Sequence, residues 1–493
     1  MGNSENNTVL DPLGEDIQTN LDILTQKSEE REQFIDRIVL DAKTAEVKDL
    51  SAEISTLIKQ QKATWKKGAI ELVSGEIIRA LGGDLAVFNY EPRAKASQEV
   101  YLYTGTHWQL LDQQVYFDFI NECAQRIGVP MEELHEPAFM ERIYWQVAFR
   151  VAHSRPIQHS SKVSRINVKN GTLEIRTDGT VTLHEHRRED YFLYCLSYVY
   201  DPATDCPLWL QFLGEVLPDA GAQRVLAEYI GYCFVRGINP EKMLVLLGGG
   251  SNGKSVTLAI IEALLGRQNV SNVTLSDLTC DAEKRCMIEG KLANISHESD
   301  REIDASMLKK IVSQEPVDIR KLYVGTRIIR EYGKLITSFN ALPRAEATHG
   351  FYRRWLILPF RRTITEQEAD VNLSAKLCGE LSGVLNWVLE ALPQFMSRGQ
   401  FSPCEVCQKE LERFRLQSDS VQLFLYECCE RDESFTTLGK DLFIKYKSFC
   451  YNDMLRPVGK QRFFERLVSL NVTRTTYGNQ VLFNVKLNPD ASI

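Results

Sequence analysis

The sequence lacks the long apolar runs, the strong positive charge and the regular cysteine spacing that mark several classes of protein. No apolar run approaches the roughly 20 residues that a membrane-spanning helix needs, so we expect no contact with a membrane. The N-terminus is polar and acidic, unlike a secretory signal. Because the formal net charge is −8, binding of nucleic acid would have to use local patches or a pore.

The 12 cysteines are mostly isolated along the chain. Two close pairs occur, Cys404 with Cys407 and Cys428 with Cys429. These four thiols could hold zinc, but one C-x-x-C beside an adjacent pair is poor ligand spacing, and reduced structural cysteines are favoured. Reduced thiols in turn favour a cytoplasmic location.

The composition is that of an ordinary globular protein, with 44% apolar and 25% charged residues. The length of 493 residues predicts two to four domains, and shifts in pattern along the chain divide it further. The predicted order is a disordered tail (1–20), a helical N-terminal region (21–83), a small α+β domain (84–202), a helical subdomain (203–240), an α/β core (241–362), a helical connector (363–419) and a winged-helix domain (420–493).

The rest of the chain is organised around Met243–Ser255, where an apolar strand enters a G-x-x-x-x-G-K-S turn. A helical pattern follows, and strand, glycine loop and helix are the context that a P-loop needs. Backbone N–H groups and the helix N-terminus would bind phosphates. We predict ATP and Mg²⁺ as cofactors, with Lys254 on the β/γ-phosphates and Ser255 on the metal. The predicted nucleotide-binding residues are Gly248, Gly249, Gly250, Ser251, Asn252, Gly253, Lys254 and Ser255.

Further short apolar strands, with helical patterns between them, predict an α/β sheet of P-loop type. These strands are Leu292–Ser296, Leu335–Phe339 and Trp355–Pro359. An acid after the first of them could hold Mg²⁺ or polarise the attacking water, and Glu298 is the first choice and Asp300 the second. After the next strand, Asn340 could orient that water, although an asparagine before a proline turn is often only turn chemistry.

Arg353 and Arg354 stand directly before the last strand of the predicted sheet. Arginines in this place suit an arginine finger, which stabilises transition-state charge and in a ring ATPase acts on the nucleotide of the neighbouring subunit. The finger interpretation therefore implies an oligomer. Salt bridging at the start of a strand is the alternative.

Two basic segments are candidates for DNA contact. Residues 320–330 hold four cations and no acid, with an interleaved tyrosine and a glycine that could turn a hairpin. An exposed basic strand is the alternative there. The C-terminal unit has basic residues on the last helix before a two-stranded wing, which could bind duplex DNA or serve only in packing or protein binding. The predicted DNA contacts are Arg320, Lys321, Tyr323, Arg327, Lys460, Arg462 and Arg466.

With these motifs in this order, the chain resembles superfamily 3 helicases. It is most similar to the phage/plasmid primase–helicase group, which includes satellite-phage and poxvirus-type enzymes. The order and spacing of the matching segments are specific to this group. The matching segments are Gly248–Ser255, Leu292–Glu298, Glu315–Tyr323, Ile336–Pro343 and Phe351–Phe360.

The resemblance implies a hexameric AAA+-type ring that moves along single-stranded or forked DNA, typically 3′→5′, during phage or mobile-element replication in a bacterial cytoplasm. It maps Lys254 and Ser255 to ATP and Mg²⁺, and Glu298 to the Walker B acid. It maps Asn340 to sensor 1. Arg353 or Arg354 would be the finger, with Arg354 preferred.

The sequence departs from the group's pattern in two ways. Leu322 stands where the group often has lysine, which moves the expected pore contact to its neighbours. No Asp-x-Asp pair, common in primase metal sites, occurs in the chain. We therefore expect the helicase part without its own primase site, working with a separate primase or polymerase. The alternatives are an ATP-driven loader or remodelling factor that does not unwind processively, and an NTP-binding assembly module with little motor activity.

Overall fold

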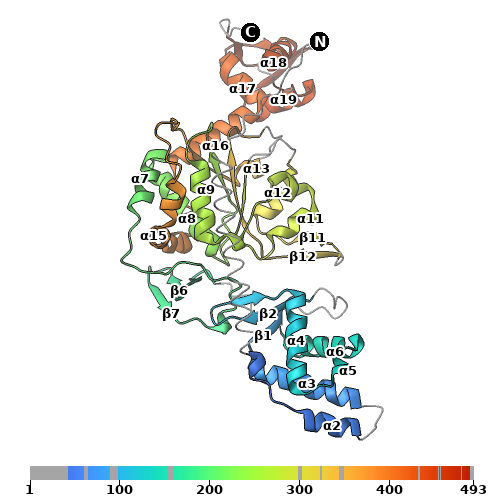
Figure 1. Cartoon of the computed structure of the whole chain (residues 1–493). Helices are drawn as coiled ribbons and strands as arrows, with labels where there is room; N and C mark the ends of the chain where they lie inside the picture. Colours follow the sequence, from blue (N-terminus) through green and yellow to red (C-terminus); the bar gives the residue numbers. More distant parts are fainter. Residues whose placement is uncertain are drawn as a thin grey trace, which may run out of the picture.

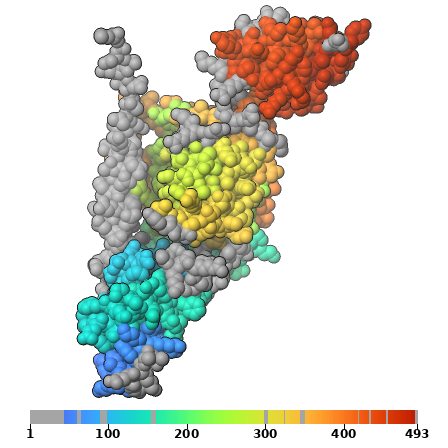
Figure 2. Space-filling view, turned by 90° about the vertical axis from the view of Figure 1, so that its right-hand side faces the viewer, coloured from blue at the N-terminus to red at the C-terminus, as the bar shows by residue number. Residues whose placement is uncertain are grey.

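The computed structural model describes residues 43–59, 65–88, 98–153, 160–297, 303–322, 325–343, 349–430, 434–452, 455, 457–478 and 480–488. The described chain is elongated, with its N-terminal helices at one end, an α/β core in the middle and a C-terminal unit at the other end (Figure 1). Figure 2 shows the C-terminal unit set off from the core. No helix among these residues is long and apolar enough to cross a membrane.

The N-terminal part packs helices against one small sheet, with strand order β3-β2-β1-β4. Its elements are α2 (Ser51–Lys59), α3 (Trp65–Leu81), β1 (Leu85–Phe88), β2 (Val100–Tyr103), β3 (Trp108–Leu110), α4 (Gln113–Ile127), α5 (Met131–Leu134), α6 (Pro137–Arg150) and β4 (Ala152–His153). Val73 of α3, Ile120 of α4 and Ile143 of α6 are fully buried in one core. This core joins residues on both sides of the predicted boundary at residue 83. The predicted tail lies outside the described residues.

The next segment forms an antiparallel sheet and two helices. Its elements are β5 (Val163–Val168), β6 (Gly171–Arg176), β7 (Val181–His184), the short 3-10 helix η2 (Arg188–Asp190), α7 (Pro207–Val216) and α8 (Ala220–Phe234). Ile166 and Leu173 of this sheet are buried with Trp209 of α7 and with residues of the central sheet. The predicted 84–202 segment therefore contributes to two separate cores, and the division into domains stays a prediction.

The central sheet has five parallel strands in the order β14-β8-β13-β10-β9. Its elements are β8 (Met243–Leu247), α9 (Lys254–Leu265), η3 (Arg267–Asn269), β9 (Val270–Ser271), α10 (Leu275–Cys280), α11 (Ala282–Arg285), η4 (Cys286–Ile288), β10 (Ala293–Ser296), α12 (Ala305–Val312), β13 (Lys334–Phe339), α13 (His349–Tyr352) and β14 (Trp355–Pro359). Four of the strands confirm the sequence prediction. The fifth, β9, was missed because two residues leave no apolar run to recognise.

Three helices follow the sheet: α14 (Leu373–Cys378), α15 (Leu381–Arg398) and α16 (Glu405–Ser418). The hairpin of β11 (Val317–Lys321) and β12 (Gly325–Ile329) forms its own antiparallel ladder. Gly325 has φ +101°, a left-handed conformation that glycine adopts without steric cost. Because β12 leads directly into β13, the hairpin emerges from the amino edge of the sheet.

The C-terminal unit has three helices followed by a hairpin, in the predicted order. Its elements are α17 (Ser420–Cys428), β15 (Cys429–Glu430), β16 (Thr437–Leu438), α18 (Gly439–Asn452), α19 (Lys460–Ser469), β17 (Arg474–Tyr477), β18 (Gln480–Phe483) and β19 (Lys486–Leu487). Phe424, Tyr446 and Phe463 share its core. Helix α17 ends at Cys428, and the next two residues, Cys429 and Glu430, pair with β19, a contact between segments far apart in sequence.

Candidate active site

The glycine-rich turn between β8 and α9 has the backbone of a closed phosphate loop. Gly250 (φ +102°), Ser251 (φ +42°) and Gly253 (φ +83°) are all left-handed. At Gly248, an added Cβ would lie 2.2 Å from the carbonyl oxygen of Phe360 and from the side-chain nitrogen of Asn252. A side chain at that position would therefore displace the loop, so glycine is required there for a steric reason.

Lys254 begins helix α9, and its side chain reaches back over the loop. Its Nζ donates to the carbonyl oxygen of Gly248 at 2.5 Å, to Oδ1 of Asn252 at 2.9 Å and to Oδ1 of Asn340 at 3.3 Å. Asn252 in turn donates to the carbonyl oxygen of Phe360 at 3.2 Å, which holds the loop against the end of β14. The structure thus brings together Lys254 and Asn340, which the sequence placed on separate elements.

The residues present fit a bound nucleoside triphosphate with its metal. A lysine ammonium, the first N–H groups of a 12-residue helix and the exposed hydroxyl of Ser255 converge at the carboxyl edge of a parallel sheet. This donor set matches the phosphates, and the hydroxyl is one of the oxygen ligands that Mg²⁺ takes. The predicted acids Glu298 and Asp300 lie outside the described residues.

His297 is the last described residue of the segment after β10. Its Nδ1 lies 3.0 Å from Oγ of Ser338 on the neighbouring strand. Burial lowers the pKa of His297, and the nearby Lys254 lowers it further. The imidazole is therefore neutral near pH 7.

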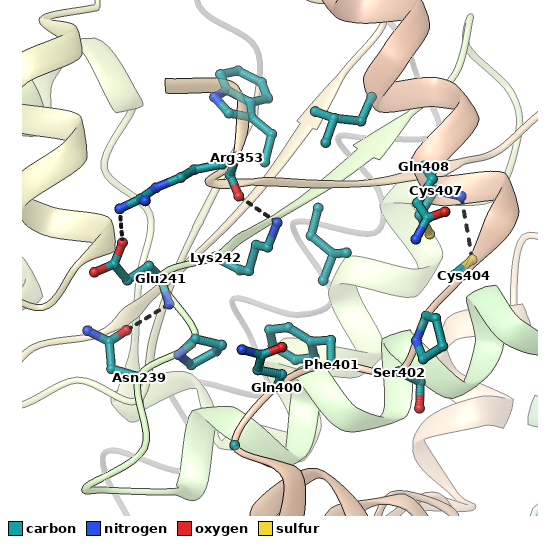
Figure 3. Close-up of a pocket in the computed structure, with 16 residues that line it drawn as sticks. Asn239, Glu241, Lys242, Arg353, Gln400, Phe401, Ser402, Cys404, Cys407 and Gln408 are labelled. Carbon is teal, nitrogen blue, oxygen red and sulfur yellow. Dashed lines mark hydrogen bonds and ion pairs between the residues drawn. The ribbon is translucent and has the colours of Figure 1, made fainter. Parts of the chain in front are cut away.

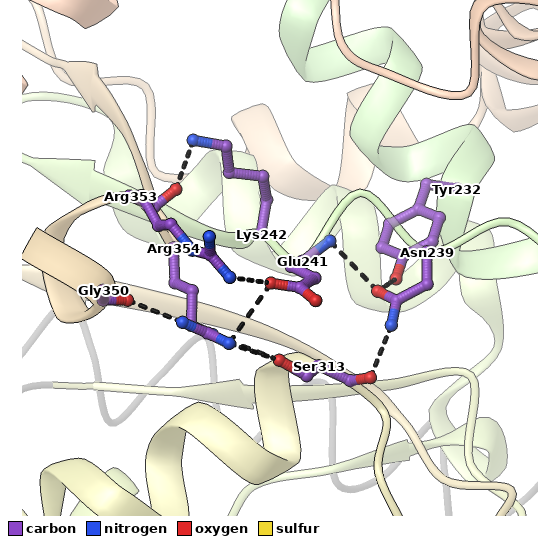
Figure 4. A network of polar contacts seen from close by, with 8 residues as sticks. All are labelled: Tyr232, Asn239, Glu241, Lys242, Ser313, Gly350, Arg353 and Arg354. Carbon is purple, nitrogen blue, oxygen red and sulfur yellow. Dashed lines mark hydrogen bonds and ion pairs between the residues drawn. The ribbon is translucent and has the colours of Figure 1, made fainter.

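The two predicted finger residues lie at the opposite, amino edge of the sheet (Figure 4). Arg353 is 53% exposed and pairs with Glu241 at 2.8 Å. Arg354 is only 11% exposed. It donates to the carbonyl oxygen of Gly350 at 2.7 Å, to Oγ of Ser313 at 2.7 Å and to Glu241 at 3.2 Å. The first arginine is therefore accessible, whereas the second is held by the protomer's own residues.

A cavity of about 730 Å³ opens beside the first of these arginines (Figure 3). It lies between the start of β8 and β14 on one side and the segment that enters α16 on the other. In the wall of this cavity, Lys242 Nζ donates to the carbonyl oxygen of Arg353 at 2.5 Å. Burial lowers the pKa of Lys242, and the nearby guanidinium groups of Arg415 and Arg353 lower it further.

The hairpin cations predicted to contact DNA each face an acid. Lys321 Nζ lies 2.8 Å from Glu99 in the N-terminal part of the chain, and Arg327 pairs with Glu289. Arg320, 65% exposed, lies 3.6 Å from Glu283. Tyr323 is outside the described residues. Burial alone would raise the pKa of Glu99, but the hydrogen bond and charge of Lys321 outweigh it and lower the net pKa.

The predicted cations of the C-terminal unit lie on one exposed helix, α19. Lys460 and Arg462 are exposed, and the Lys460 ammonium lies 5.6 Å from the centre of the Phe464 ring. Arg466 is 44% exposed and pairs with Asp419 at 2.6 Å. The beginning of the helix is thus the accessible basic surface.

Sequence reasoning did not assign roles to several residues that support these sites. Arg285 is almost fully buried and donates to the carbonyl oxygens of Leu278 and of Asp318, so it ties helix α10 to the base of the hairpin. The role of Asn252 as a second anchor of Lys254 was also missed. The role of Arg285 has no local signal, because its partner Asp318 lies on another element. The contact of Asn252 with Lys254 is local, but the contact that holds Asn252 against Phe360 is not.

Two family models match separate parts of the chain: "D5 N terminal like" over residues 89–218 and "Family of unknown function (DUF5906)" over residues 246–354. The proposed primase C962R of African swine fever virus (a tick isolate from Malawi) is 26% identical over 206 residues, covering 38% of this chain and 21% of that protein. The proposed helicase 022R of Frog virus 3 (isolate Goorha) is 24% identical over 284 residues, covering 51% of this chain and 29% of that protein. This chain therefore matches less than a third of the length of either relative.

Among solved structures, the A form apo structure of the NrS-1 C terminal region matches with a TM-score of 0.50 at 10% identity, covering 83% of this chain and 97% of the other. That likeness concerns the fold alone. The family models and the viral relatives agree with the motifs found in the sequence. In these two segments the chain is therefore similar to primase–helicases of the superfamily 3 type, in agreement with its motifs.

Proposed function

We propose that this protein is an ATP-dependent DNA helicase that works as a ring, most simply a hexamer, and moves 3′→5′ along single-stranded DNA. The observation that carries the proposal is the convergence of Lys254 and Asn340 at one edge of the parallel sheet, with Arg353 and Arg354 at the other edge. ATP and Mg²⁺ are the cofactors in this account. Ser255 would hold the metal together with Glu298 or Asp300.

The distance between the two edges supports a site shared by two protomers. Strand β8 pairs residue by residue with β14, from Met243 beside Trp355 to Leu247 beside Pro359. A strand of this length spans about 15 Å, more than an arginine side chain extends. The arginines therefore lie too far from their own P-loop and would act on the nucleotide of a neighbour. Exposure favours Arg353 for this role, whereas the family pattern prefers Arg354.

In this account bound ATP supplies the phosphoanhydride bond whose hydrolysis drives movement. Lys254 binds the terminal phosphates, and Asn340, 3.3 Å from the same ammonium, orients the attacking water. The arginine from the next protomer would stabilise the charge that develops on the transferred phosphate. The hairpin, with Arg320, Lys321, Tyr323 and Arg327, would contact the strand in the pore.

The C-terminal unit would act as a winged-helix domain that binds duplex DNA. Three helices and a hairpin in this order support that assignment, together with the exposed Lys460 and Arg462 on α19 and the exposed wing residues Arg474 and Tyr477. A separate primase or polymerase would work with this protein at the fork.

Strand displacement on a duplex with a 3′ single-stranded tail tests the proposal. The purified chain should separate the strands only with ATP and Mg²⁺, and a duplex with a 5′ tail should stay paired. The Lys254→Ala variant is the control for contaminating helicases. ATP hydrolysis stimulated by single-stranded DNA, without displacement of either substrate, would favour the loading or remodelling factor instead.

A further inference from the structure

A hollow of about 360 Å³ lies at the amino edge of the central sheet, next to the hairpin, and none of the predicted contact residues lines it. We call it the amino-edge hollow. It is formed by the end of α8, the turn before β10, and the segment between the hairpin and β13. Its lining contains four cations and one acid: Arg236, Lys291, Arg330, Lys334 and Glu331. A hollow with this excess of positive charge attracts anions.

Two lysines of the amino-edge hollow are poorly compensated by acids. Burial lowers the pKa of Lys334 to about 8; the Cys233 thiol and Glu331 oppose this shift, while Arg236 adds to it. Burial also lowers the pKa of Lys291. A partly buried ammonium without a matching carboxylate is unfavourable, and an anion in the hollow would offset that cost.

Lys334 is held in place from two sides. Its Nζ lies 2.9 Å from Oε1 of Gln314 and 4.6 Å from the centre of the Tyr232 ring. Gln314 itself has φ +53°, a left-handed conformation that non-glycine residues adopt at a cost of about 1 kcal/mol. The fold thus maintains an unfavourable backbone conformation at the residue that positions this ammonium.

Arg330 is the accessible cation of the amino-edge hollow. Its side chain is exposed and makes no ion pair or hydrogen bond with the residues that the structure describes. Arg236, in contrast, pairs with Glu331 at 2.7 Å. A ligand could therefore bind Arg330 without breaking a contact to the described part of the protein.

The amino-edge hollow continues directly from the hairpin. Arg330 follows the last residue of β12, and Arg327 of that strand pairs with Glu289, next to Gly290 in the hollow. A neighbouring hollow, of about 430 Å³, shares Arg236, Gly290 and Leu292 with the amino-edge hollow. It extends to the sheet of β5 and β6. A chain of phosphates leaving the hairpin would meet these cations in succession.

We propose that the amino-edge hollow binds the phosphate backbone of single-stranded DNA next to the hairpin, with Arg330, Lys291 and Lys334 as the phosphate contacts. This inference rests on the proposed function, because the strand is the one that the hairpin would hold. It adds a further group of phosphate contacts to those of the P-loop, the hairpin and the C-terminal unit. No base-specific contact is required, since the cations recognise only the backbone.

The test measures binding of a fluorescein-labelled oligothymidylate to the full chain without ATP, over a range of salt concentrations. Replacing Arg330 and Lys291 together with alanine should weaken binding about tenfold and reduce the salt slope by about 0.7 for each lost phosphate contact. Lys376→Ala, which removes an exposed cation on α14, is the matched control and should leave both quantities unchanged. Basal ATP hydrolysis should also stay unchanged in the double variant.

A second measurement tests whether Lys334 gains a proton when the oligonucleotide binds. Because the pKa of Lys334 is about 8, roughly half of its side chains are neutral at that pH, and a bound phosphate should draw a proton onto them. Calorimetry of the same oligonucleotide at pH 8, in buffers with different ionisation enthalpies, should therefore show proton uptake. Lys334→Met should abolish this uptake.

The outcomes separate this inference from the proposed function. In one outcome, the wild type binds tightly while the variants of the amino-edge hollow keep its affinity, salt slope and proton uptake. That result would overturn the inference and leave the helicase proposal intact. Absence of oligonucleotide binding and strand displacement by the wild type would overturn the proposed function, and the inference with it. Binding of inorganic pyrophosphate in the hollow, without competition from the oligonucleotide, would show a free-anion site and also overturn the inference.

Discussion

At the scale of single residues, the proposed ATP binding depends most on the P-loop lysine. Lys254 is almost fully buried and contacts the loop and the next strand through Gly248, Asn252 and Asn340. The predicted consequence is that nucleotide binding and water positioning depend on one ammonium and one amide.

Lys254→Ala should abolish ATP hydrolysis, because the terminal phosphates lose their only charged contact from this loop. Asn340→Ala should retain nucleotide binding but lower kcat about 100-fold or more, as loss of one positioned polar group in an active site typically does. Steady-state hydrolysis and nucleotide titration separate the two effects. Wild-type turnover in either variant would contradict the assigned role of that residue.

The arginine pair should divide into one residue that supports the fold and one that does not. Arg354→Ala removes hydrogen bonds to Gly350 and Ser313 and should lower the free energy of unfolding by about 1–3 kcal/mol. Arg353→Ala removes an exposed ion pair to Glu241 and should change stability by less than about 1 kcal/mol. Chemical denaturation of the two variants measures this difference. Equal losses of stability would show that both arginines are structural.

Sequence reasoning was most successful where a motif fixes local geometry. Gly248 and Gly253 follow from the P-loop pattern, and the structure gives the steric reasons, a clash and a left-handed backbone. The partners of charged residues could not be predicted. Glu99 and Lys321 are 222 positions apart, and only tertiary packing brings them together.

At the scale of elements, the hairpin of β11 and β12 is anchored at its base and linked to the N-terminal part near its tip. Arg285 fixes the base through the carbonyl oxygen of Asp318, and the ion pair of Lys321 with Glu99 makes the link. In this conformation the Lys321 ammonium is paired with the Glu99 carboxylate. DNA phosphate would have to compete with Glu99 for the same ammonium.

Glu99→Gln should therefore strengthen binding of single-stranded DNA a few-fold, since Lys321 is released and one repulsive charge is removed. Fluorescence anisotropy measures the affinity. Glu283→Gln, which removes the acid beside Arg320 on the same hairpin, is the matched control and should have a smaller effect because that pair is longer and more exposed. Unchanged or weaker binding in Glu99→Gln would show that the ion pair does not compete with DNA.

The same ion pair should also depend on pH in a defined direction. The pKa of Glu99 is lowered in the folded chain, so the stabilisation from the pair is present above the carboxyl's unfolded pKa and is lost as pH falls through the folded one. Both side chains are about one-third exposed, which limits the contribution to less than about 1 kcal/mol. The stability difference between wild type and Glu99→Gln should be constant near neutral pH and disappear in acid.

Element prediction succeeded for long apolar or amphipathic segments and failed for short ones. The strands around the P-loop were found because each is a continuous apolar run of about five residues, next to a recognisable motif. Strands β9 and β15 have two residues each, and their pairing partners lie in distant segments. Local sequence contains no signal for such pairing.

At the scale of the whole molecule, the described chain separates the two sets of proposed catalytic residues across the sheet. Lys254 and Asn340 lie at the carboxyl edge and Arg353 and Arg354 at the amino edge. One protomer would thus supply the P-loop side of one ATP site and the arginine side of a neighbouring one. The resemblance to primase–helicases and the parallel sheet could be predicted from motif order, whereas the distance between the two sets needed the strand register.

The central claim, an ATP site completed by a neighbouring protomer, is tested most directly by mixing two inactive variants. Lys254→Ala protomers keep their arginines, and arginine variants (Arg353→Ala or Arg354→Ala) keep their P-loops. If one of the two arginines is the finger, mixing its alanine variant with Lys254→Ala protomers in equal amounts should restore ATP hydrolysis at the mixed interfaces. Particle mass measured in the same sample must show mixed oligomers. Mixed oligomers that remain as inactive as the separate variants, for both arginines, would contradict the shared site.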